Sequence, residues 1–217
     1  MARPTSRNFA AALLLATAAI AQEVKLPDEP EVSFGVTTVS SAGLKGDIYL
    51  LKRGTDYLPN FKKLKPIGSV YTPALNMPTR DFKEGFPGVT DRYEWFAIDY
   101  QGRFWIAKPG KYNFALAADD GAKLYIDGKN IIDNDGLHST KVLTNDVKLA
   151  EGVHKIRVSY FQGPGSSLAL ILAVSRPGET TWRIFHTHDY KPPAGKFDDG
   201  SVEASASEAG KKTKKRK

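Results

Sequence analysis

The adjacent carboxylates Asp119 and Asp120 are the residues of this sequence whose types and spacing suggest chemistry. They stand within Ala117–Gly128, where a turn carrying both carboxylates joins two alternating apolar runs, and a second turn, Asp127-Gly128, follows. Alternating runs joined through Asp and Gly are typical of β-hairpins. Neighbouring carboxylates also supply the oxygen ligands that hard cations prefer. The stretch is therefore predicted to be a hairpin with a candidate cation site.

A plain turn is the alternative at both oxygen-rich turns. Aspartate is common in turns because its carboxylate accepts hydrogen bonds from nearby backbone N–H groups. Taken alone, the run Asp133-Asn134-Asp135-Gly136 is predicted to be such a turn. It could also line the same end of the fold as Asp119 and Asp120, which makes Asn134 and Asp135 candidate ligand-binding residues.

Other motifs of catalysis and metal binding are weak. His186 and His188 are two residues apart on an expected last strand, so both would lie on one face. A stable zinc site normally uses at least three protein ligands, which favours surface histidines there. The sequence has no G-x-S-x-G elbow, H-E-x-x-H helix or phosphate-binding glycine loop. We therefore expect no enzymatic activity.

The elements that must position these side chains are β-strands. Turn residues recur at short intervals, and no segment keeps a helical period. The sequence predicts an all-β fold, a single β-sandwich. It also predicts a turn at Gln101-Gly102, and an irregular connection between Lys52 and Asp91 with one short strand near Ile67–Tyr71. The other expected strands are Val32–Val39, Gly43–Leu51, Tyr93–Tyr100, Arg103–Ile106, Lys111–Leu116, a short run through Leu124 and Ile126, Ile131-Ile132, Lys141–Leu149, a run through Ile156, Val158 and Tyr160, and Leu168–Val174.

Four regions are expected along the chain. Residues 1–21 resemble a secretory signal peptide, with basic residues before an apolar run and small residues at Ala19-Ile20-Ala21. The apolar run is too short for a membrane span of about 20 residues. Residues 22–31 read as a linker, 32–190 as the β-sandwich domain and 191–217 as a disordered tail. The protein is thus expected to be secreted or periplasmic, and the lack of cysteine leaves its fold without disulfides.

The positive charge is concentrated in the tail. Of the 31 basic residues, two lie in residues 1–21 and six in the last seven residues, 211–217, which leaves 23 against 24 acidic residues in residues 22–210. Such a tail could contact an anionic surface, although a solvated, disordered end is the expected alternative. The six residues are Lys211, Lys212, Lys214, Lys215, Arg216 and Lys217.

Five blocks of the chain, in order, resemble the protective-antigen-type domain called PA-fourteen. They are Gly43–Tyr49, Ile98–Phe104, Pro109–Phe114, Asp119–Gly128 and Gly152–Val158. The resemblance covers about Gly43 to Phe185. It implies a β-sandwich of secreted, mostly bacterial proteins and yeast adhesins that usually serves as a carbohydrate-binding or recognition module.

The resemblance also implies a calcium site. In the adhesin branch, paired aspartates joined by a cis peptide hold a calcium ion that bridges to sugar hydroxyls, and the matching residues are Asp119 and Asp120. Those adhesins add an asparagine from a later loop, but the matching loop, Phe161–Ser167, has no Asn or Asp. Gln162 or Ser166 could supply an oxygen ligand instead.

Together these features predict a secreted, non-catalytic recognition module. Its expected partner is a glycan or cell-surface polysaccharide, with binding that depends on calcium at Asp119 and Asp120. The alternative is a structural or protein-interaction module of the cell envelope that uses its basic tail.

Overall fold

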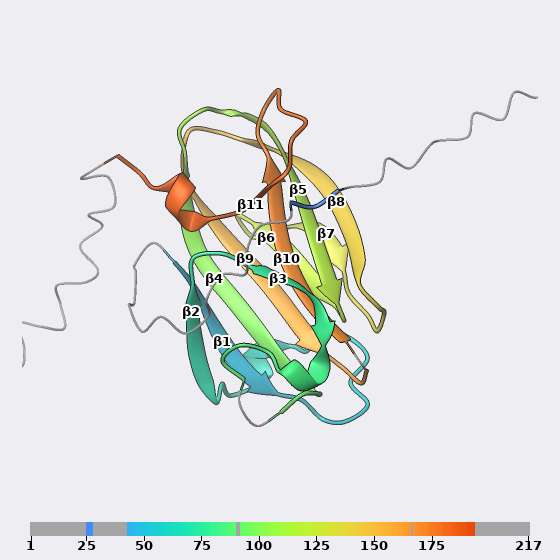
Figure 1. The fold of residues 1–217 in the computed structure, drawn as a ribbon. Helices are drawn as coiled ribbons and strands as arrows, with labels where there is room; N and C mark the ends of the chain where they lie inside the picture. Colours follow the sequence, from blue (N-terminus) through green and yellow to red (C-terminus); the bar gives the residue numbers. More distant parts are fainter. Residues whose placement is uncertain (1–24, 28–42, 90–91, 166, 194–217) are drawn as a thin grey trace, which may run out of the picture.

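The computed structural model describes residues 25–27, 43–89, 92–165 and 167–193. The expected signal peptide, the strand Val32–Val39 and the basic tail lie outside these residues. So does most of the expected linker. The described part of the chain forms an antiparallel β-sandwich, as the sequence predicts (Figure 1).

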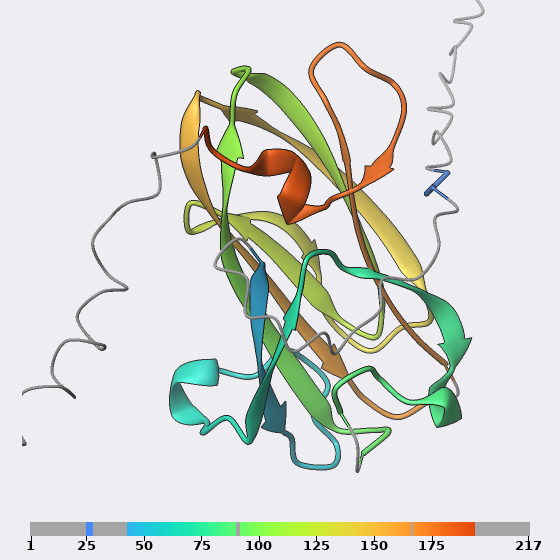
Figure 2. The same ribbon diagram turned by 60° about the vertical axis from the view of Figure 1, so that its left-hand side comes forward.

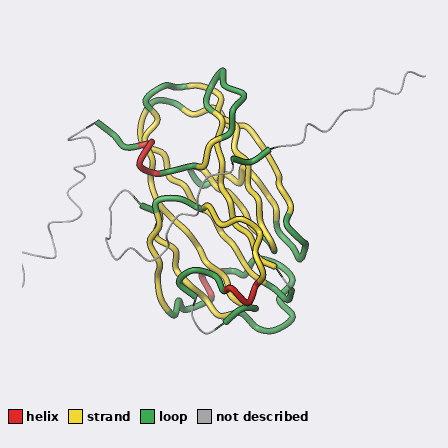
Figure 3. The backbone as a smooth tube through the Cα atoms, in the orientation of Figure 1, coloured by secondary structure: helices red, strands yellow, loops and turns green. Residues whose placement is uncertain are grey.

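Strands dominate the described residues, and helix is limited to three short 3-10 turns (Figure 3). The 3-10 turns are η1 (Phe61–Lys63), η2 (Phe82–Glu84) and η3 (Thr187–Tyr190). No helix in the described ranges has the length and apolar character needed to cross a membrane. The strands are β1 (Leu44–Leu50), β2 (Gly68–Thr72), β3 (Asn76–Asp81), β4 (Phe96–Ile106), β5 (Gly110–Asp119), β6 (Ala122–Ile126), β7 (Lys129–Asn134), β8 (Lys141–Leu149), β9 (Gly152–Gln162), β10 (Ser167–Ser175) and β11 (Arg183–Ile184).

The strands make two sheets. The larger has six strands in the order β2-β1-β4-β9-β6-β7, and the smaller has the order β11-β10-β5-β8, with β3 pairing beside β11 on β10. The turned view of Figure 2 shows the long strands β4 and β9 of one sheet passing across β5 and β10 of the other. The chain crosses from the smaller to the larger sheet between β5 and β6, where Asp119 and Asp120 lie, so the hairpin predicted across this turn is wrong. Strand β6 instead forms a hairpin with β7 through the turn at Asp127 and Gly128.

Alternating apolar side chains of the two sheets form the core. Successive side chains of a strand point to opposite faces, so every second residue enters the core. Burying a large apolar side chain contributes roughly 1.5–3 kcal/mol relative to leaving it in water. The core residues of β9 and β5 are the ones that their alternation predicts, namely Ile156, Val158, Tyr160, Tyr112, Phe114 and Leu116.

The turn predicted at Gln101-Gly102 is wrong. Both residues lie inside the continuous strand β4, which pairs with β1 and β9 through this point. A Cβ atom added at Gly102 would lie 2.8 Å from Leu44 Cδ2. Close packing against Leu44 of β1 therefore explains the glycine. In the sequence, a glycine required by packing cannot be told from a glycine required by a turn.

Strand β3 contradicts the irregular connection predicted between Lys52 and Asp91. The expected short strand is present as β2, but β3 also forms and pairs with β10, with Met77 opposite Leu170. Pro78 lies where the register of this pair shifts. Proline has no N–H to donate and is tolerated at such irregular points. Tertiary pairing with β10 explains a strand that the local sequence does not predict.

Candidate functional site

Asp119 and Asp120 occupy the point where the chain passes from one sheet to the other. Asp119 ends β5, Ala122 begins β6, and the Asp119-Asp120 peptide bond is cis. Their exposed fractions are 5% and 4%. A Cβ atom at Gly121 would overlap the ring of Phe161 and lie 2.8 Å from the backbone nitrogen of Gly136. Only glycine therefore fits this crossing.

The carboxylate of Asp120 accepts hydrogen bonds at both oxygens. The backbone N–H of His138 donates to Oδ1 at 3.1 Å, and that of Gly163 donates to Oδ2 at 2.8 Å. The side-chain amide of Gln162 also donates to Oδ2, at 3.1 Å. Burial raises the pKa of Asp120 above its ordinary value, and the charge of Asp119 adds to this, although the two N–H groups oppose it. The carboxylate thus holds together the loops that precede His138 and follow Gln162.

Asp119 is held by hydroxyl groups. Ser167 Oγ donates to its Oδ2 at 2.7 Å, and Thr140 Oγ1 donates to the same oxygen at 3.3 Å. The phenolic oxygen of Tyr160 lies 2.7 Å from the backbone carbonyl oxygen of Asp119 and 2.6 Å from Gln162 Oε1. A hydroxyl group can donate or accept a hydrogen bond, whereas a backbone N–H group can only donate. The hydroxyl groups around Asp119 can therefore turn their oxygen atoms towards a bound cation more readily than the N–H groups around Asp120 can.

Asn134, at the end of β7, links β6 to β8. It pairs in register with Ala122 of β6, and its Nδ2 donates to the carbonyl oxygen of Lys141 at 2.9 Å. Lys141 is in turn the register partner of Ala118 in β5. Asn134 is 1% exposed, and its Oδ1 is buried without a hydrogen-bond partner in the described part of the structure. A buried acceptor left without a partner is uncommon and calls for a physical explanation.

Asp135 supports the neighbouring loop. Its Oδ1 accepts the backbone N–H groups of Leu58 at 2.8 Å and Gly136 at 2.9 Å, and its Oδ2 lies 3.0 Å from Lys123 Nζ. The contacts of Asp135 are thus those of a turn aspartate, while Gln162 reaches Asp120 directly. Ser166 lies outside the described residues, and its neighbour Ser167 contacts Asp119.

Exposed apolar side chains lie at the rim of this site. Tyr57 is 65% exposed, and its ring lies 3.6 Å from the position of a Cβ atom at Gly136. Leu137 is 42% exposed and packs against Gly163, where a Cβ atom would overlap it. Sequence reasoning missed both residues, as well as His138, Thr140 and Ser167. The sequence contains an indication for Ser167, which is next to the candidate ligand Ser166. No sequence pattern marked Tyr57 as part of the site.

The histidines predicted to share one face of the last strand do not do so. The last strand is β11 (Arg183–Ile184), and His186 precedes η3 while His188 lies within it. No cluster of three or more His, Cys, Asp or Glu side chains able to hold a metal occurs in the described ranges. A count of these four side-chain types leaves out the amide, hydroxyl and carbonyl oxygens that calcium also uses as ligands.

The chain is similar to known PA14 domains. The PA14 domain family matches residues 72–184. The PA14 domain of the antifreeze protein MpAFP is 20% identical, with a TM-score of 0.58 over 77% of this chain and 94% of that one. The PA14 sugar-binding domain of an RTX adhesin is 16% identical, with a TM-score of 0.55 over 67% of this chain and 96% of that one.

A third solved structure has the same fold in another setting. It is an anti-sigma factor domain-containing protein from Clostridium clariflavum, 21% identical, with a TM-score of 0.52 over 70% of this chain and 47% of that one. No curated protein matches the sequence. The family match covers more than half of the chain, and solved PA14 domains have the same fold. The chain therefore belongs to the PA14 domain family.

Proposed function

We propose that this protein is a non-catalytic carbohydrate-binding module whose sugar site lies at Asp119 and Asp120. The observation that carries the proposal is the pair of buried carboxylates at the crossing between the sheets, with the buried Asn134 opposite Ala122, two residues after Asp120. The RTX adhesin domain of the same fold is a sugar-binding domain, which supports carbohydrate binding as the general function. The position of the sugar and the dependence on calcium are inferred from the residues.

Calcium fits the oxygen atoms of this site. Two adjacent carboxylates repel each other when both are ionised, and a divalent cation relieves that repulsion. The buried Oδ1 of Asn134 has no hydrogen-bond donor among the described residues, so it is available to a cation. Asp119, Asp120 and Asn134 would hold the ion, and the hydroxyl groups of Thr140 and Ser167 would support Asp119. A bound calcium ion supplies positive charge to which sugar hydroxyls can bind.

The rim would give the site its apolar contact. An exposed aromatic ring offers its face to the C–H side of a sugar, and Tyr57 is the exposed aromatic residue beside Gly136. Leu137 extends the apolar surface towards Gly163. We infer that the sugar lies over the carboxylate pair and contacts Tyr57.

Binding of calcium is tested first by thermal unfolding with calcium and with chelator. A ligand that binds only the folded state stabilises it by about 2.7 kcal/mol at a hundredfold excess over its dissociation constant. We expect calcium to raise the midpoint of the wild type and to leave that of Asp119→Asn unchanged. Asp146→Asn is the matched control, because Asp146 is a half-exposed carboxylate that pairs with Lys111 on β5. A midpoint indifferent to calcium in the wild type would refute the ion site.

Sugar binding is tested on a glycan array with the same proteins. We expect retention in calcium, loss in chelator and in Asp119→Asn, and weakened retention in Tyr57→Ala. Equal retention with and without chelator, and in Asp119→Asn and Tyr57→Ala, would place the sugar elsewhere on the molecule. If calcium binds but no glycan is retained, the module is a calcium-stabilised scaffold and the carbohydrate proposal fails.

We further propose that the module acts outside the cytoplasm, as the apolar run in residues 1–21 suggests. The mass of the exported protein tests this. Cleavage as expected would leave Gln22 at the amino terminus. A protein that keeps residues 1–21 in the soluble fraction of the cell would contradict it.

A further inference from the structure

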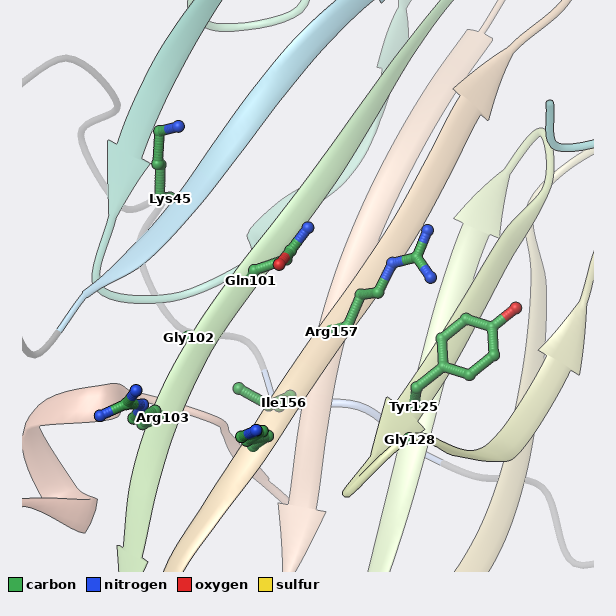
Figure 4. Close-up of a pocket in the computed structure, with 9 residues that line it drawn as sticks. Lys45, Gln101, Gly102, Arg103, Tyr125, Gly128, Ile156 and Arg157 are labelled. Carbon is green, nitrogen blue, oxygen red and sulfur yellow. The ribbon is translucent and has the colours of Figure 1, made fainter. Parts of the chain in front are cut away.

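A hollow of about 590 Å³ lies on the outer face of the larger sheet, away from the aspartate pair. Its volume is within the range of ligand pockets, roughly 300–1,000 Å³. Lys45, Gln101, Arg157 and Tyr125 are paired in register across the neighbouring strands β1, β4, β9 and β6. Figure 4 shows their side chains in this order across the sheet. We call this surface the Arg157 groove.

Arg157 is fixed in place at the centre of the groove. Its Nε donates to Asp99 Oδ1 at 2.7 Å, and the centre of the guanidinium group lies 5.5 Å from the ring of Phe61 and 5.2 Å from that of Tyr125. Asp99 is 3% exposed and also accepts hydrogen bonds from Ser159 and Gln101. A buried carboxylate and two aromatic rings thus hold one long side chain in a single orientation.

The terminal nitrogens of Arg157 remain available to a ligand. No hydrogen bond in the described part of the chain engages Nη1 or Nη2, and the side chain is 39% exposed. A planar guanidinium group binds carboxylates through two parallel N–H donors. Because its orientation is already fixed, little side-chain entropy is lost when a ligand binds.

Further positive charges surround Arg157. Arg103 and Lys155 are opposite each other in the pairing of β4 with β9, and Lys45 borders the groove on β1. The nearby acidic groups are Asp99, which is buried under Arg157, Asp47, which lies 2.8 Å from Lys45, and Asp127, whose carboxylate binds His154 and the backbone N–H of Lys155. Each of these carboxylates already has a partner, so the charge open to a ligand is mainly positive, which favours an anionic ligand.

We propose that the Arg157 groove binds an anionic polysaccharide through the carboxylate groups of its uronic-acid sugars. The guanidinium group of Arg157 receives a carboxylate, and the exposed face of Tyr125 contacts a sugar ring. Residues 22–210 carry 23 basic against 24 acidic residues, so this part of the protein lacks the broad positive field that attracts nucleic acid. The groove shares no residue with the calcium site, and this proposal holds or fails independently of it.

The experiment measures binding of an oligogalacturonate to the full chain in chelator, beside its methyl-esterified form. Chelator removes any contribution of calcium at Asp119 and Asp120. We expect the charged oligosaccharide to bind, with an affinity that falls as salt rises, and the ester to bind at least about tenfold more weakly because it lacks the charge. Equal binding of the two forms would overturn the proposal.

Variants assign the binding to the groove. Arg157→Lys keeps the charge but loses the paired donors, and we expect about tenfold weaker binding. Arg183→Lys is the matched control, because Arg183 is a half-exposed arginine on β11 of the other sheet. Tyr125→Ala should also weaken binding, while Asp119→Asn should leave it unchanged. Unfolding midpoints of all variants separate lost binding from lost folding.

Three results would refute the assignment. Equal losses in Arg157→Lys and Arg183→Lys would mean that binding reflects overall charge. Full binding by a folded Arg157→Lys protein would remove the central residue from the site. Tighter binding of single-stranded poly(dT) than of oligogalacturonate would make the groove a nucleic-acid site instead.

Discussion

The hydroxyl group of Tyr160 lies 2.7 Å from the backbone carbonyl oxygen of Asp119. Tyr160 belongs to the core face of β9 and is fully buried, and burial raises the pKa of its phenol well above the ordinary value. The phenol therefore stays protonated and can donate to Asp119. This bond connects the aromatic core of one sheet to the crossing that carries the candidate ion site.

Replacing Tyr160 with Phe should destabilise the protein by about 1–3 kcal/mol, since a buried acceptor is left without its donor. Calcium affinity should also fall, although Tyr160 is not an ion ligand. Urea unfolding and calcium titration measure the two effects. Tyr100→Phe is the matched control, because the hydroxyl of Tyr100 is buried without a hydrogen-bond partner among the described residues. Removing that hydroxyl should be neutral or stabilising, and equal losses in both variants would contradict the role given to Tyr160.

Substitutions of the two aspartates should differ in their effect on folding. Asp120→Asn places an amide N–H₂ where backbone N–H groups already donate, so we expect a loss of about 1–3 kcal/mol without calcium. Asp119→Asn should cost less, because the hydroxyl groups of Ser167 and Thr140 can turn to accept from the new amide. Urea unfolding in chelator compares them. A larger loss in Asp119→Asn would mean that the hydroxyl contacts are not adaptable.

Stability and calcium binding should respond to pH in opposite directions through Asp120. The pKa of Asp120 is raised by burial, so the folded protein binds this proton more tightly than the unfolded chain does. In chelator, the contribution of this group is therefore present at low pH and is lost as pH rises from its ordinary value through the raised pKa. Calcium must displace the same proton, so its affinity should fall as pH drops through the raised pKa.

Calorimetric calcium titrations over a pH series, beside unfolding in chelator, measure both trends. The slopes matter here, because other carboxylates titrate in the same range. An apparent calcium affinity that is constant down to the ordinary pKa of an aspartate would refute the link to Asp120.

Asp127 should stabilise the turn between β6 and β7. It has a φ of 50°, and its carboxylate lies 2.6 Å from His154 Nδ1 and accepts the backbone N–H of Lys155 at 2.9 Å. Asp127→Ala should cost about 1 kcal/mol, because it removes these bonds from a backbone conformation that Asn and Asp tolerate best. Asp127→Asn should keep most of the stability. Thermal unfolding of both variants checks this. Equal losses of stability in the two variants would mean that Asp127 stabilises the protein through its charge and not through the turn geometry.

Much of the sandwich could be predicted because period-two alternation directly reflects burial. In β5 and β9 the apolar residues at every second position, such as Phe114, Ile156 and Val158, are buried in the core. The misread features are those whose cause is distant in sequence. Gly102 is small because Leu44 packs against it, and β3 is extended because β10 pairs with it. Neither partner is visible from the local sequence.

The candidate site was predicted in part for the same reason. Asp119, Asp120 and Asn134 stand in recognisable turns, and the structure brings these turns together at one end of the sandwich. Thr140 and Tyr57 come from loops without a distinctive pattern, so only the fold shows that they border the pair. The Arg157 groove was not foreseen, because its four residues are ordinary outward-facing positions on four separate strands.

The crossing between β5 and β6 tolerates sequence change less well than a loop that only borders it. Asp119, Asp120 and Gly121 join the two sheets, so a change there alters the relation of the layers as well as the site. Tyr57 belongs to the loop between β1 and β2, two strands of the same sheet, so that loop borders the crossing without joining the sheets. A repertoire of binding specificities could therefore be built by exchanging this loop on one unchanged sandwich, as antibodies do with their variable loops.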